Sequence, residues 1–130
     1  MRNGLTKLTY GNMTIGSEVA RFWRDGTLKI SAVEQAEFLA RLGRGSLPVP
    51  RGVQAQVKEL TLKEKTDTCR LHSKGGSSIG TKPQVGWWVG WIERGDEISS
   101  FALNIDITDI GRSDEHAAIG RECLKALGKL

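Results

Sequence analysis

The sequence has 130 residues, of which 38% are hydrophobic and 26% charged, and its formal net charge is +4. This balance is ordinary for a soluble globular protein, and the length fits one domain, or part of one, with a modest core. Basic residues are interspersed with acids, so nucleic-acid binding is not indicated, and no apolar run could span a membrane. Because no apolar leader follows Met1, the chain as written would stay in the cytoplasm. Cys69 and Cys123 lack metal-ligand spacing, so we expect two buried free thiols and no metal site.

The first 30 residues show little regular pattern. Tyr10-Gly11-Asn12 predicts a turn, because glycine and asparagine accept positive φ angles. Residues 13–29 are expected to form a loop, and the Phe22-Trp23 pair within it indicates that the loop folds onto another part of the protein.

Two helices are expected next. Ser31 with Glu34 three residues later forms a capping box, which predicts a helix start, and Gly43 and Gly45 end that helix. Its apolar face is expected to hold Val33, Ala36, Leu39 and Ala40. After two prolines, a second helix is expected, with Lys58 to Lys65 as a solvated charged face and an inward stripe of Val53, Val57 and Leu60.

From Thr68 onward the apolar period changes to two, which is typical of strands. Strands are expected over about 68–74, 85–93 and 100–107, with a Gly/Ser loop at 75–83 and a hairpin turn at 94–96. The second strand is apolar on both faces, so it should lie in the centre of a covered sheet. A last helix should begin near Ser113 and turn inward Ile119, Cys123, Ala126 and Leu127.

This order predicts an α+β fold, an antiparallel sheet of about three strands with helices packed against it. Residues 1–66 would form a loop and helical part, and residues 67–130 the strands and the last helix. One sheet edge and one face would stay open, so the fold looks unfinished. We expect exposed faces of Trp88 and Phe101 to promote oligomerisation.

The stretch from Leu71 to Ile92 has the clearest functional pattern. Lys74 and the two glycines after it stand at the end of an apolar run. This pattern is typical of a strand at a sheet edge, where a lysine lies beside backbone that no side chain covers. Such an edge can dock an extended acyl-amide ligand as one more strand, with Lys74 at the ligand's negative end. The alternatives are a solvated strand end for Lys74 and simple core packing for the three tryptophans of this stretch.

Several short motifs, taken in order, resemble the class D serine β-lactamases over nearly the whole chain. The chain resembles the C-terminal portion of these longer enzymes. Their S-x-x-K motif, with the nucleophilic serine and the general-base lysine, and an S-x-V motif lie upstream, and neither precedes Tyr10 here. The matching motifs are Tyr10-Gly11-Asn12, Phe22-Trp23, Leu28-Lys29-Ile30-Ser31, Lys74-x-Gly76, Gly86-Trp87-Trp88-Val89-Gly90-Trp91 and Phe101-Ala102-Leu103-Asn104-Ile105-Asp106.

The resemblance implies catalytic roles for three positions. Lys74 would stabilise the substrate carboxylate and help protons move. The backbone N–H of Ser77 would supply half of the oxyanion hole. Trp23 would donate its indole N–H to a carbamylated lysine, which is missing here, and no other cofactor is implied.

The resemblance also implies a substrate-binding cleft, and there the chain departs from the family. Tyr10 and Asn12 would edge the cleft, and Gly75 and Gly76 would line it. The family has Lys-Thr-Gly where this chain has Lys74-Gly75-Gly76, so a hydroxyl that would bind the substrate carboxylate is lost. By the resemblance, His116 stands where the family has an arginine for that carboxylate, and both changes affect one anion-binding corner.

We therefore expect a truncated class D β-lactamase-like protein, inactive alone and periplasmic in the parent family. Its partners would be a β-lactam, a second copy of the chain or the missing N-terminal half. The alternatives are a complementing half of a split enzyme, a non-catalytic penicillin-binding or sensor-like module, and a generic α+β interaction protein.

Overall fold

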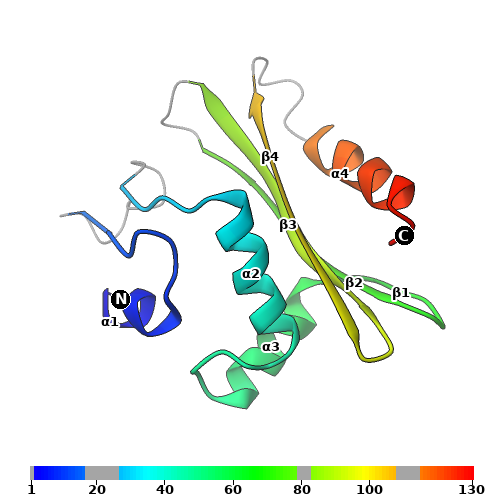
Figure 1. Cartoon of the computed structure of the whole chain (residues 1–130), viewed down its shortest axis with the longest axis horizontal. Helices are drawn as coiled ribbons and strands as arrows, with labels where there is room; N and C mark the ends of the chain where they lie inside the picture. The colour runs from blue at the N-terminus through cyan, green and yellow to red at the C-terminus, as the bar shows by residue number, and fades with distance from the viewer. Residues whose placement is uncertain (1, 17–26, 79–82, 108–114) are drawn as a thin grey trace.

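The structure, a computed structural model, describes residues 2–16, 27–78, 83–107 and 115–130. Its strands form one antiparallel sheet in the order β1-β2-β3-β4, with α2 and α3 on one face and α4 on the other (Figure 1). This arrangement confirms the α+β class. None of the described helices is long and apolar enough to cross a membrane. The elements are α1 (Arg2–Leu8), α2 (Ala32–Gly43), α3 (Arg51–Thr61), β1 (Leu62–Lys65), β2 (Arg70–Ser77), β3 (Gln84–Arg94), β4 (Glu97–Ile107) and α4 (Glu115–Ala126).

The α2 helix begins where its capping box predicts. Glu34 N–H donates to the Ser31 hydroxyl at 3.2 Å, and the Glu34 carboxylate accepts from Ser31 N–H at 2.8 Å. The buried face holds Gln35, Leu39, Leu42 and Gly43. Val33 is 69% exposed, so its expected inward position is wrong.

β3 lies between β2 and β4, as its apolar pattern predicts. Successive side chains of a strand point to opposite faces, so Trp91 packs under α2 and Trp88 packs under α4. Trp88 is only 4% exposed, and its ring lies 4.5 Å from that of the half-buried Phe101. The expectation of an exposed Trp88 is therefore wrong, because α4 covers it, and the core interpretation of Trp88 and Trp91 is confirmed.

A fourth strand, β1, takes the place of the charged end expected for the second helix. It pairs antiparallel with the first part of β2, and all four of its residues are exposed. The pairing shifts by one residue between Leu62 and Glu64, so Lys63 is the extra residue of a β-bulge. The sheet therefore has four strands rather than three, and it begins at Leu62, before the expected boundary at residue 67.

The α3 helix is held by a polar anchor instead of the expected apolar stripe. Gln54 is 3% exposed, and its amide binds the backbone of Leu47 and the carbonyl oxygen of Val49. Val53 and Leu60 are 49% and 80% exposed, so their expected inward positions are wrong, whereas Val57 packs against the core as expected.

The α4 helix also faces the sheet with residues other than those expected. His116, Gly120 and Leu124 are buried, whereas Ile119 and Leu127 are 44% and 72% exposed. Cys123 is exposed and Cys69 half-buried, so the expectation of two buried thiols is wrong. Gly120 faces the sheet because the large ring of Trp88 fills the space between helix and sheet at that point.

A buried histidine joins α3 to the sheet. The ring of His72 stacks on Trp91 with 4.5 Å between centroids, and Nδ1 donates to the Lys58 carbonyl oxygen at 2.9 Å. Nε2 has no hydrogen-bond partner in the described part of the chain and lies 3.6 Å from a Glu93 carboxylate oxygen. Burial lowers the pKa of the His72 imidazole and outweighs the opposing effects of the Lys58 carbonyl and Glu93. Burial works to raise the pKa of Glu93, but hydrogen bonds from Lys58 and Trp91 hold it below its ordinary value.

Candidate functional site

A cleft of about 800 Å³ lies on the α2 face of the sheet, beyond the N-terminal end of α2. It brings together four residues that the sequence singled out. They come from the second strand and from the turn near residue 10, which are more than 60 positions apart in the sequence. The four residues are Tyr10, Lys74, Gly75 and Gly76.

The cleft carries positive charge. Lys74 and Lys29 both line it, and no acidic side chain is among its described lining residues. The Lys74 ammonium donates to the neighbouring carbonyl oxygen of Gly75. An anionic ligand therefore fits the cleft better than a cationic one.

The outer edge of β2 is open along this cleft. β1 pairs with β2 only as far as His72, which leaves residues 73–77 with β3 as their sole strand partner in the described sheet. Ser78 N–H donates to the Val85 carbonyl oxygen at 2.9 Å. Because hydrogen-bonded residues alternate along an antiparallel pair, the N–H of Ser77 points away from β3, toward the open edge. Ser77 is exposed, although it is not one of the lining residues of the cleft.

Tyr10 is fixed at the cleft wall by α2. Its hydroxyl donates to the Gln35 Oε1 atom at 2.6 Å, and its ring packs edge-on against Phe38 with 4.8 Å between centroids. Burial raises the pKa of the Tyr10 phenol, although the hydrogen bond to Gln35 opposes this shift. Gln35 was missed as a site residue; the signal for it was a polar side chain four positions before Leu39 on the apolar face of the helix.

Asn12 is not one of the lining residues of the cleft, but it binds the backbone of the segment that contributes Lys29 to the lining. Its side chain donates to the Thr27 carbonyl oxygen at 2.9 Å and accepts from Lys29 N–H at 3.1 Å. The turn has the positive φ that its sequence predicts, since Gly11 lies at +53° against the Lys29 carbonyl group. Asn12 thus holds the turn and the 27–29 segment together.

His116 lies on the other face of the sheet from Lys74. It is 6% exposed and sits beneath Gly75, where a Cβ atom would come within 3.1 Å of its Nε2 atom. The two departures from the family pattern are therefore adjacent in space. His116 nevertheless does not line the cleft that holds Lys74.

Trp23 and Phe22 lie outside the described residues, so the role expected of Trp23 cannot be compared with any contact in the structure. Within the described ranges no three His, Cys, Asp or Glu side chains are grouped so as to hold a metal ion.

Comparison with known proteins finds class D β-lactamases over the full chain. The β-lactamase OXA-5 of Pseudomonas aeruginosa is 38% identical over 98% of this chain, and OXA-48 of Klebsiella pneumoniae is 38% identical over 96% of it. These matches cover 49% and 47% of the two relatives, so the chain spans about half their length. No family model matches the sequence.

Comparison with solved structures also finds class D β-lactamases. The class D β-lactamase FUS-1 (OXA-85) from Fusobacterium nucleatum subsp. polymorphum superimposes with a TM-score of 0.94 at 44% identity and covers all of this chain and 54% of its own. The class D enzyme YbXI from Nostoc gives a TM-score of 0.92 at 35% identity, with 55% of its chain covered.

Proposed function

The chain belongs to the class D β-lactamases and spans about half the length of its relatives, and from this we propose that it forms the substrate-lining wall of such an enzyme and is inactive alone. The observation that carries the proposal is the grouping of Lys74, Gly76 and Tyr10 around one positively charged cleft. The Ser77 N–H at the open edge of β2 supports it further.

The proposed roles divide between charge and hydrogen bonding. Lys74 attracts the carboxylate of a β-lactam, and the Ser77 N–H donates to the carbonyl oxygen that becomes an oxyanion. Trp23 keeps its proposed contact with a carbamylated lysine supplied by the other half of the enzyme. Tyr10 acts as a fixed wall, because α2 holds its hydroxyl and its ring.

Acyl transfer needs a nucleophile with an adjacent base, and the sequence contains no S-x-x-K motif. We therefore expect the purified 130-residue chain to hydrolyse a chromogenic cephalosporin no faster than buffer. The enzyme FUS-1 serves as the positive control. Hydrolysis above buffer that is lost in Lys74→Gln would show that this chain is an enzyme by itself and would refute the proposal.

Ligand binding alone should also be weak. A hydrogen bond to a charged group contributes about 1.5–3 kcal/mol, and Gly75 cannot supply one from a side chain. A saturating β-lactam should leave the melting temperature of the chain unchanged. The double variant Gly75→Thr with His116→Arg, which restores the family pattern, should show a rise. A rise in the unmodified chain would instead favour a penicillin-binding or sensor-like module.

A complementing half of a split enzyme is the second candidate, and β4 favours it. β4 is the last strand of the sheet and has 11 residues, so a long row of backbone groups is free along its outer edge in the described sheet. Co-expression with the N-terminal half of FUS-1 should give a complex on gel filtration and cephalosporin hydrolysis. Separate elution and no activity would remove this candidate.

A further inference from the structure

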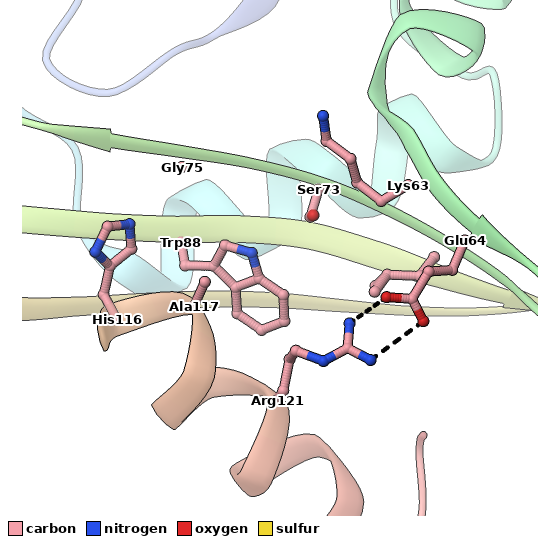
Figure 2. A pocket seen from close by; sticks show the side chains of 9 residues that line it. Lys63, Glu64, Ser73, Gly75, Trp88, His116, Ala117 and Arg121 are labelled. Carbon is pink, nitrogen blue, oxygen red and sulfur yellow. Dashed lines mark hydrogen bonds and ion pairs between the residues drawn. The ribbon is translucent and has the colours of Figure 1, made fainter. Parts of the chain in front are cut away.

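A second pocket, of about 380 Å³, lies on the α4 face of the sheet, opposite the cleft described above (Figure 2). Gly75 of β2 borders both cavities, and its neighbours divide between them: Leu71 and Ser73 line this pocket, whereas Lys74 and Gly76 line the cleft. Its volume falls within the range of small-molecule sites. We call it the α4 pocket.

Two hydrogen-bond donors, from Trp88 and Ser73, line the α4 pocket. Trp88 and Ser73 line it and are 4% and 6% exposed. Neither the Trp88 indole N–H nor the Ser73 hydroxyl has a hydrogen-bond partner among the described residues. Figure 2 shows the Ser73 hydroxyl and the nitrogen-bearing edge of the Trp88 ring turned to the same side of the pocket. An indole N–H can only donate, so a group that satisfies it must be an acceptor.

The charges around the α4 pocket indicate an anionic acceptor. Arg121 is held by both carboxylate oxygens of Glu64, one of them at 3.2 Å, so this pair is internally neutral. Lys63 also lines the pocket, and its ammonium has no ion-pair partner in the part of the chain that the structure describes. The β-bulge places Lys63 here, because it is the extra residue opposite β2. Lys63 is exposed, and Figure 2 shows its ammonium turned away from the Trp88 ring, so this flexible side chain must swing inward to meet a bound anion.

The rest of the lining is apolar. Leu71, Ala117 and the ring of Trp88 form it, and Leu71 is only 1% exposed. His116 lies at the end of the pocket next to Gly75 and is only 6% exposed. Its Nδ1 atom has no hydrogen-bond partner among the described residues. A flat apolar body can pack against these walls while a charged end meets the donors.

We propose that the α4 pocket binds a small aromatic carboxylate. Its carboxylate accepts hydrogen bonds from the Trp88 N–H, the Ser73 hydroxyl and the Lys63 ammonium, and its ring packs against Leu71 and Ala117. This site is separate from the cleft, since Lys74 lies on the opposite face of the sheet.

Benzoate is the probe that tests the proposal, with benzyl alcohol as its uncharged counterpart. The ¹H–¹⁵N spectrum of the chain reports the indole N–H of Trp88, which the variant Trp88→Phe identifies by its missing signal. Benzoate should shift this signal saturably and benzyl alcohol should not. Absence of a saturable shift up to the solubility limit of benzoate would overturn the proposal.

Two lysines of β1 provide a matched pair of variants. Lys63→Gln should weaken benzoate binding about threefold to tenfold, as expected for one charge-assisted hydrogen bond near the surface. Lys65→Gln makes the same change of charge two residues away, outside the pocket lining, and should leave the affinity unchanged. Equal effects of the two variants, or none from Lys63→Gln, would mean that benzoate responds only to net charge or binds elsewhere.

A third variant separates this site from the cleft. Lys74→Gln should leave benzoate binding intact, whatever its effect on a β-lactam. If Lys74→Gln abolishes the benzoate shift while Lys63→Gln does not, the anion binds in the cleft, and the α4 pocket proposal fails while the proposed function stands.

Discussion

The contact between α4 and the sheet yields a sharp prediction at Gly120. Gly120 is buried in α4, and a Cβ atom there would lie 2.2 Å from Cε3 and 2.6 Å from Cζ3 of Trp88. Carbon atoms do not approach so closely, so either the ring or the helix must move. The ring has little freedom, because it is 4% exposed and lies 4.5 Å from Phe101 on its other side.

The expected cost follows from two opposing effects. Overpacking of a well-packed core costs about 1–3 kcal/mol, and replacing glycine by alanine inside a helix returns about 1 kcal/mol. Because the overlap with Trp88 is severe, the overpacking cost should lie in the upper part of its range, so we expect Gly120→Ala to lower the free energy of unfolding by about 1–2 kcal/mol after the helix gain is subtracted.

Gly52→Ala is the matched control. Gly52 lies in α3, and a Cβ atom there would have no neighbour within 4 Å. It should raise the free energy of unfolding by up to about 1 kcal/mol. Urea unfolding followed by tryptophan fluorescence measures both variants, with comparison of slopes to check that unfolding stays two-state. If both variants change stability in the same direction, α4 does not seat on Trp88 as described.

Three further predictions concern other buried or capping contacts. Tyr10→Phe keeps the ring but leaves the buried Gln35 oxygen without its donor, so the free energy of unfolding should fall by about 1–2 kcal/mol; unchanged stability in urea would contradict the buried hydrogen bond. His72→Asn keeps a donor for the Lys58 carbonyl oxygen but cannot titrate. Because the folded-state pKa of His72 is lowered, its contribution to stability is full above about pH 6.5 and is lost as the pH falls through the folded-state pKa. The loss of stability on acidification should therefore be smaller in His72→Asn, and parallel pH profiles of the two proteins would refute this. Ser31→Ala should cost about 0.5–2 kcal/mol through the lost cap of α2, and thermal unfolding with no shift would show that the cap contributes nothing.

Short sequence patterns correctly predicted those parts of the fold that depend only on residues close together in the chain. The Ser31 cap, the alternation from Leu71 onward and the turn before Glu97 each depend on a few neighbouring residues, and each has the structure expected. The grouping of Tyr10 with Lys74 came from the family resemblance, because no local pattern connects positions so far apart in the chain.

The errors occur where packing overrides local pattern. β1 reads Leu-Lys-Glu-Lys with every side chain exposed, so only its backbone pairing with β2 makes it a strand, and its charges resemble the end of a helix. In α4, hydropathy favours Ile119 and Leu127, but the ring of Trp88 needs the space that Gly120 leaves. Gln54 was overlooked because a buried amide is recognised only once its backbone partners are known.

The register of β2 against β3 determines which of its side chains line the cleft and which line the α4 pocket. Its pairing with β3 runs without interruption from Arg70 to Ser77, so each side chain is assigned to one face by a single count. Insertion of one residue after His72 would exchange the faces, since the side-chain period of a strand is two. Lys74 would then point under α4 and the cleft would keep only one of its two lysines, Lys29, even though every side chain of the strand had been retained.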